Sequence, residues 1–198
     1  MKLMASYISN DHETGGSALK MLTWPDSSLI RSGKPVFLDY KNRMMLHPGL
    51  GVRIKNVGKS IKAKFAEKYY DELFPLIFIL KGETSERIAY GEDPKACGLV
   101  ADYSIIVGET LRGASENKMT VKINMQSLYD NEEASCVIGI DNPKQVIAST
   151  IEEASKENTL KTGDIVGCLF PERLKAERDT LLTVVINDTE NHIENKLK

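Results

Sequence analysis

The chain contains 198 residues, with 26 Lys and Arg against 28 Asp and Glu, and its formal net charge at pH 7 is -2. A near-neutral chain has no broad positive field, so we expect neither a nucleic acid nor a membrane as a partner. This length is enough to bury one self-sufficient core. The sequence therefore predicts a single domain over residues 1–198.

The number and spacing of the three cysteines indicate the redox state of the compartment. Cys97, Cys136 and Cys168 are far apart and form no CxxC pair, which argues against a disulfide framework and against a zinc ribbon. We interpret them as buried thiols in a reducing compartment. Residues 1–16 contain no apolar signal region, and no later stretch approaches the ~20 apolar residues of a membrane span. The predicted location is the cytoplasm.

The first third of the chain combines turn formers with short apolar pieces. Residues 1–33 are rich in Gly, Pro, Ser and Asp, and they predict a short strand, a loop and a leading or lid segment. Residues 34–40 are typical of a strand, and residues 50–57 alternate as a half-buried strand does. We expect these two strands to be neighbours.

A helix is predicted next, over residues 61–73. Ser60 can cap it, and apolar side chains recur every four residues to form a stripe that we assign to the core. The stripe consists of Ile61, Phe65, Tyr69 and Leu73. Residues 75–80 are continuously apolar, which is typical of a strand covered on both faces.

The second half of the chain is rich in predicted strands. Pro143 follows Asn142 at a helix start, and the helix is expected to run to about residue 156. The polar tail over residues 187–198 is expected to fray. Runs of strands with only two helices predict a sheet-dominated α+β fold. The strands are expected at residues 102–109, 119–125, 131–140, 160–166 and 180–186.

Several motifs occur in an order that is specific to one family. They are PDSSLIRSGKPVFLDY over residues 25–40, RIKNVGKSIKAKFAEKYYDE over residues 53–72, Lys95-Ala96, and LKTGDI over residues 160–165. This set resembles the short, single-domain members of the fumarylacetoacetate hydrolase family. The resemblance implies a mixed β-roll with peripheral helices and commonly a homodimer. It also implies cleavage, isomerisation or decarboxylation of small oxo acids through a divalent metal.

The resemblance also indicates what the metal site has lost. The family holds Mg²⁺, Mn²⁺ or Ca²⁺ with a Glu-x-Glu pair and an Asp, and the matching positions here are His47, Gly49 and Phe78. A hard cation needs oxygen ligands, and carboxylates compensate its charge. One imidazole in place of three carboxylates predicts that no metal cofactor is bound.

Four residues remain as candidates for chemistry. His12, Glu13 and His47 are candidate acid–base groups, and Lys95 matches a family lysine that faces the substrate carboxylate. Lys95 can equally be an ordinary surface lysine. His47 could join His12 and Cys97 in a zinc site, but the absence of a local ligand pair favours a structural histidine.

Three functions are consistent with these observations. The first is a catalytically inactive or diverged relative, retained for binding or assembly. The second is a hydrolase, isomerase or decarboxylase for acylpyruvate or 2-hydroxy-dienedioate substrates, with a non-standard site built on His47, His12 and Lys95. The third is a structural subunit that pairs with an active paralogue in a hetero-oligomer. Whether the chain is an enzyme stays open at this point.

Overall fold

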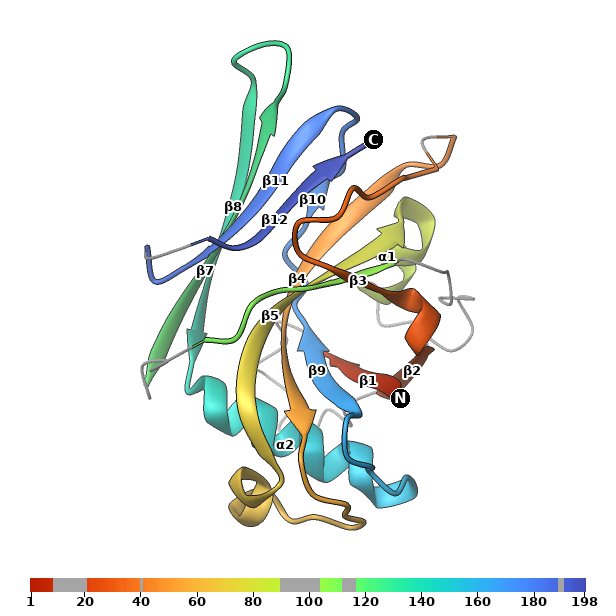
Figure 1. Ribbon diagram of the computed structural model, residues 1–198, viewed down its shortest axis with the longest axis vertical. Helices are drawn as coiled ribbons and strands as arrows, with labels where there is room; N and C mark the ends of the chain where they lie inside the picture. Colours follow the sequence, from red (N-terminus) through yellow and green to blue (C-terminus); the bar gives the residue numbers. More distant parts are fainter. Residues whose placement is uncertain (9–20, 40, 90–103, 112–116, 189–190) are drawn as a thin grey trace.

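Two β-sheets form the body of the structure (Figure 1), a computed structural model that describes residues 1–8, 21–39, 41–89, 104–111, 117–188 and 191–198. Within these ranges the large sheet has eight strands in the order β2-β1-β9-β4-β5-β6-β3, with β10 paired to β4, and the small sheet has the order β12-β11-β7-β8. The strands are β1 (Lys2–Tyr7), β2 (Met21–Pro25), β3 (Leu29–Arg31), β4 (Met44–Ile54), β5 (Tyr70–Lys81), β6 (Ile105–Val107), β7 (Lys118–Ser127), β8 (Glu133–Asp141), β9 (Ile165–Leu169), β10 (Leu174–Lys175), β11 (Thr180–Ile186) and β12 (Asn191–Leu197). The helices are α1 (Gly82–Ala89) and α2 (Pro143–Glu157), with 3-10 turns η1 (Asp26–Ser28) and η2 (Ala63–Lys68).

The antiparallel pair β4 and β5 forms the centre of the large sheet. Its register runs from Met44 opposite Lys81 to Ile54 opposite Tyr70. The predicted strand over residues 75–80 is confirmed, and each of its side chains is buried. A continuous apolar run suits this place because both faces of the sheet are covered.

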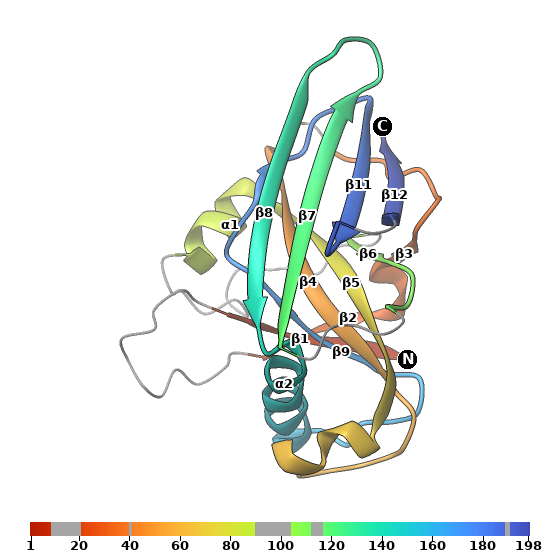
Figure 2. The same ribbon diagram turned by 90° about the vertical axis from the view of Figure 1, so that its left-hand side faces the viewer.

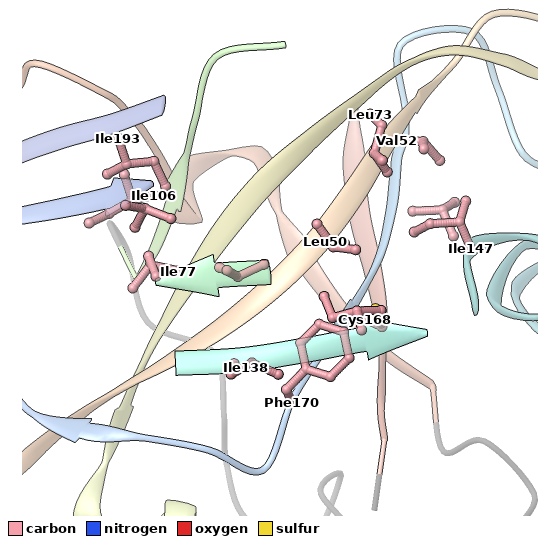
Figure 3. Close-up of a cluster of buried hydrophobic side chains, with 14 of the residues drawn as sticks. Leu50, Val52, Leu73, Ile77, Ile106, Ile138, Ile147, Cys168, Phe170 and Ile193 are labelled. Carbon is pink, nitrogen blue, oxygen red and sulfur yellow. The ribbon is translucent and has the colours of Figure 1, made fainter. Parts of the chain in front are cut away.

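Successive side chains of β5 enter two different hydrophobic clusters, because side chains alternate between the two faces of a strand. Ile77 belongs to the larger cluster, which gathers residues from both sheets and from α2. Figure 3 shows part of it, with Leu50 of β4, Ile138 of β8 and Ile147 of α2. Phe78 belongs to the smaller cluster on the other face.

The sheet-dominated α+β prediction is confirmed, and so is the helix expected over residues 142–156. Pro143 is at the start of α2, and Asn142 before it has a left-handed backbone with φ of 49°. The helix buries Ile147 and Ile151 in the larger cluster. Among the described helices, none is long and apolar enough to cross a membrane.

The predicted helix over residues 61–73 is wrong. Only the six-residue turn η2 forms, and β5 begins at Tyr70. Leu73 pairs with Val52 of β4, so the sheet takes the residues that the helical spacing assigned to a second turn. Of the expected core stripe, Phe65 is 43% exposed, with Lys64 Nζ 4.9 Å from its ring centroid. Local periodicity was overridden by long-range strand pairing.

The predicted strand over residues 34–40 is also wrong in its described part. Val36 makes only an isolated bridge, to Leu197 of β12 rather than to β4. Pro35 has no N–H to donate to a ladder, which limits pairing at this point. The segment lies along β12 and not beside residues 50–57.

The tail predicted to fray is an ordered strand over its described part. β12 pairs with β11, and Ile193 and Leu197 are fully buried. Glu194 and Lys196 between them are exposed, so the tail has the two-residue alternation of a half-buried strand. Its high charge concealed this pattern.

Two further expectations concern the start of the chain and the thiols. Within residues 1–33, β1, β2 and β3 are strands of the large sheet, and residues 9–20 lie outside the described part, so a lid stays a prediction.

Cys168 is buried as expected, and burial raises the pKa of its thiol to about 12. Cys136 is only half-buried, and Cys97 lies outside the described residues.

Candidate functional site

The three positions that match the family's metal ligands lie together on β4 and β5. His47 is directly opposite Phe78, and Gly49 is two residues further along β4, opposite Leu76. His47 is 1% exposed and Phe78 is fully buried. The structure thus brings His47, Gly49 and Phe78 into one buried place in the large sheet.

An aromatic ring fills the space beside Gly49. A Cβ atom added to Gly49 would lie 2.6 Å from Cε2 of Phe78, and it would also meet the backbone oxygen of Cys168. The Phe78 ring packs at a tilt of 49° against Trp24, with ring centroids 5.5 Å apart. Gly49, the predicted match to the second family carboxylate, therefore has no room for a side chain in this packing.

The His47 imidazole makes a hydrogen bond through each of its nitrogens. Nδ1 is 3.0 Å from the backbone oxygen of Phe170, and Nε2 is 2.8 Å from Oγ of Ser85 in α1. A carbonyl oxygen can only accept, so we place the proton on Nδ1. Nε2 then accepts a hydrogen bond from the Ser85 hydroxyl.

Arg173 completes this cluster from the segment between β9 and β10. Its guanidinium donates to Oγ of Ser85 at 3.0 Å and to the backbone oxygen of Ser85 at 3.2 Å. Burial lowers the pKa of His47 to about 4, the hydrogen bond to Phe170 opposes this shift, and the Arg173 charge adds to it. The imidazole is therefore neutral near pH 7.

This set of donors does not fit a hard divalent cation. No carboxylate lies at any of the three positions, and both nitrogens of His47 are engaged by protein groups. Within the described ranges, no group of three His, Cys, Asp or Glu side chains is placed to hold a metal. Magnesium, manganese and calcium all prefer oxygen ligands and charge compensation.

The other residues named from the sequence cannot be placed. His12 and Glu13 fall within residues 9–20, and Lys95 falls within residues 90–103, both outside the described part of the chain. Their acid–base and substrate-binding roles stay predictions. The same holds for a zinc site that would join His12 and Cys97 to His47.

Sequence reasoning missed Ser85 and Arg173. Both belong to segments whose neighbours are set only by the fold, since α1 was not predicted and Ser85 is 38 positions from His47 along the chain. In the structure Ser85 and Ile88 are three residues apart, a helical spacing, and both are buried, but that burial is not visible in the sequence.

The comparisons with known proteins support the architecture. No family model matches the sequence, and no curated protein matches it. Among solved structures, the 2-hydroxyhepta-2,4-diene-1,7-dioate isomerase of Mycobacterium marinum superposes with a TM-score of 0.74 at 12% identity, over 99% of this chain and 73% of that one. A Yersinia pestis protein assigned to the fumarylacetoacetate hydrolase family gives 0.76 at 13% identity, over 100% and 92%.

A maleylpyruvate hydrolase from Sphingobium gives a TM-score of 0.69 at 15% identity, over 100% of this chain and 71% of that one. Identities this low establish the fold alone. The similarity nevertheless covers essentially the whole chain and includes three differently named members of one structural group. The protein has the fold of the fumarylacetoacetate hydrolase family.

Proposed function

We propose that this protein is a catalytically inactive or diverged relative of the fumarylacetoacetate hydrolase enzymes, without their metal, whose fold serves binding or assembly. The observation that carries the proposal is the contact between the Phe78 ring and Gly49. It fills the family's metal place with an apolar side chain. His47, the one polar side chain of the three, is committed to Ser85 and Phe170.

Energetics argue against recruitment of a cation into this place. A buried charge without compensating ligands is strongly unfavourable. Making room would also require Phe78 to leave its contact with Trp24, and removing a buried aromatic side chain costs about 3–5 kcal/mol. Neither cost is offset by any carboxylate at the three positions.

The test of this proposal is a turnover screen. The full chain is offered acylpyruvates, oxaloacetate and 2-hydroxy-dienedioates, with and without added Mg²⁺ or Mn²⁺. The expected result is no rate above the uncatalysed background in either condition. Metal-dependent turnover of any of these substrates would contradict the proposal.

A second candidate function is metal-free catalysis on the same class of small oxo acids. It is favoured by the 2.8 Å contact between Ser85 Oγ and His47 Nε2, which has the geometry of a nucleophile and its base. We rank it second because Ser85 is 1% exposed and the lowered pKa of His47 makes the imidazole a weak base. Labelling of Ser85 by a fluorophosphonate, absent in S85A, would favour this candidate.

The proposed partners follow from the family resemblance. We propose a homodimer, with a hetero-oligomer containing an active paralogue as the alternative, and a small oxo acid as the possible ligand. We propose the cytoplasm as the location, on the basis of the cysteine usage. Co-purification from the source cell distinguishes a homodimer from a complex with a paralogue.

A further inference from the structure

A cavity of about 550 Å³ lies at one end of the large sheet, where β3, β4 and β6 end and β9 begins. Its lining also includes residues of the turn η1 and Met1, which precedes β1. Sites for small molecules commonly have volumes of about 300–1,000 Å³. The cavity is therefore large enough to hold a small ligand.

This cavity is separate from the hydrogen-bonded cluster around His47. Arg53, which lines the cavity, is six residues from His47 on β4, roughly 20 Å along the strand. Figure 2 shows β3, β6 and the N-terminus on the right of the molecule, and α1, which contains Ser85, on the left. A ligand in this cavity would not use the residues that match the family's metal ligands.

Apolar side chains from three strands form part of the cavity wall. Ile165 of β9 is 1% exposed and belongs to the smaller hydrophobic cluster. Leu29 of β3 and Val107 of β6 are half-buried and pack against the same cluster. The smaller cluster thus reaches the wall of the cavity, where an apolar part of a ligand would extend it. Each methylene group buried in this way tightens binding by about fourfold.

Two arginines line the same cavity beside these apolar residues. Arg31 is opposite Val107 in the pairing of β3 with β6, and Arg53 is opposite Ile165 in the pairing of β4 with β9. Paired positions on neighbouring strands face the same side of a sheet. Both arginines are exposed, so their guanidinium groups are accessible to a ligand from solvent. The cavity therefore combines apolar surface with two permanently charged donors.

Neither guanidinium group is neutralised by a carboxylate of the described residues. The ion pairs found among those residues involve neither Arg31 nor Arg53. Nη1 of Arg53 is 3.9 Å from Sδ of Met1, which is only a weak acceptor. Asp26 also lines the cavity. Two guanidinium groups and one carboxylate leave a surplus of one positive charge.

We propose that this cavity binds a monocarboxylate that carries an unbranched apolar chain. The guanidinium groups of Arg31 and Arg53 bind the carboxylate, because the planar fork of an arginine matches a carboxylate with two parallel hydrogen bonds. The chain packs against the apolar wall that includes Ile165. The single negative charge of this ligand equals the surplus positive charge of the lining.

The first test is isothermal titration of the full chain with octanoate. Saturable binding in the millimolar range or tighter is expected, and hexanoate should bind about fourfold more weakly for each missing methylene group. Octanol and octylamine have the same chain without the negative charge, and each should bind at least about tenfold more weakly, because charge-assisted hydrogen bonds are lost. Absence of saturable octanoate binding, or equal binding of octanol or octylamine, would overturn the proposal.

The second test removes each guanidinium group in turn. R31Q and R53Q should each weaken octanoate binding by about tenfold or more. R43Q is the matched control, since Arg43 is exposed, pairs with Glu86 and does not line the cavity. Urea unfolding verifies that all three variants are folded. If R31Q and R53Q bind octanoate as R43Q does, the assignment of the two arginines is wrong.

The third test locates the ligand by protection of a thiol in a C97S/C136S background. Ser27 is exposed and lines the cavity, so octanoate should slow the labelling of S27C by a maleimide. S135C is the control, because Ser135 is exposed on β8 and lies outside the cavity. Its labelling rate should not change. Equal effects of octanoate on the two thiols would show that the ligand does not occupy this cavity.

This inference goes beyond the proposed function and does not rest on it. Absence of octanoate binding would overturn the ligand proposed for the cavity and would leave both the loss of the metal site and the homodimer untouched. Metal-dependent turnover would contradict the proposed function and leave the cavity untouched. The two failures are therefore distinguishable.

Discussion

The His47 imidazole joins three segments that are distant in sequence. It belongs to β4. Its Nε2 accepts a hydrogen bond from the Ser85 hydroxyl of α1, and its Nδ1 donates one to the backbone oxygen of Phe170, directly after β9. At only 1% exposure, a charged imidazole would be poorly solvated. The cluster therefore requires a neutral histidine, and this requirement can be measured.

The stability of the protein should depend on pH through His47. The pKa of this group is about 4 in the folded chain and about 6.5 when unfolded, so the unfolded state binds the extra proton between these values. Stability is complete above about pH 6.5 and falls as the pH is lowered toward 4, by roughly 3 kcal/mol in total. Urea unfolding across this range measures it. H47Q should lack this part of the pH dependence, and an unchanged slope in H47Q would contradict the assignment.

Removing the Ser85 hydroxyl should destabilise the fold. S85A leaves Nε2 of His47 without its donor and takes one acceptor from Arg173. An unsatisfied buried polar group costs about 1–3 kcal/mol. Chemical denaturation of S85A checks this value. S135A, at an exposed serine, is the control and should unfold like the wild type.

Truncation of Phe78 tests the packing around His47 and Gly49. F78A should lower stability by about 3–5 kcal/mol, because a fully buried ring is removed. F65A is the matched control, since Phe65 is 43% exposed, and its cost should be well below that of F78A. Both are measured by urea unfolding. Equal effects of the two substitutions would contradict the packing described for Phe78.

At the scale of elements, β12 shows where local pattern and tertiary structure combine. Ile193 and Leu197 were present in the sequence, but the polar residues around them predicted a loose tail. The strand forms because β11 offers a partner edge and the larger cluster offers a place to bury both side chains. Neither condition is visible in the twelve residues themselves.

Ile193 should therefore behave as a core residue. I193A should cost about 2–4 kcal/mol, the range for a buried isoleucine truncated to alanine, whereas K196A, at an exposed neighbour, should be nearly neutral. Thermal unfolding of the two variants measures the difference. A frayed tail would tolerate both substitutions equally, and that outcome would contradict the ordered β12.

The predicted elements succeeded where the signal was local and failed where it was not. The strand over residues 75–80 and the helix from Pro143 were predicted by apolar runs and a helix start, and both are confirmed. Residues 61–73 have the spacing of a helix but do not form one, because Tyr70 and Leu73 pair with β4. Spacing alone does not indicate that a partner strand will claim the same residues.

At the scale of the molecule, apolar packing on both faces of the large sheet accounts for its core without a cation. β4 and β5 are buried by the two clusters on either side, and these clusters hold the centre of the sheet together. The resemblance of motifs predicted this fold from the sequence. It also matched His47, Gly49 and Phe78 to the family's metal ligands; the structure has these residues as neighbours in β4 and β5, and their match to a metal site stays a prediction.

The hydrogen-bond partners of His47 could not be predicted from the sequence. The contacts of His47 with Ser85 and Phe170 span 38 and 123 positions along the chain. Arg173 reaches Ser85 across 88 positions. No local pattern encodes such distant neighbours, so only the folded structure reveals that a neutral His47 is held by hydrogen bonds to Ser85 and Phe170.

The central claim is that the region around His47, Gly49 and Phe78 cannot hold a divalent cation. Isothermal titration of the full chain with Mg²⁺ and with Mn²⁺ tests it most directly. No binding heat is expected in the micromolar range for either ion, and none for F78A, which vacates space without adding a ligand. Micromolar binding of either ion that is abolished by H47Q would contradict this claim.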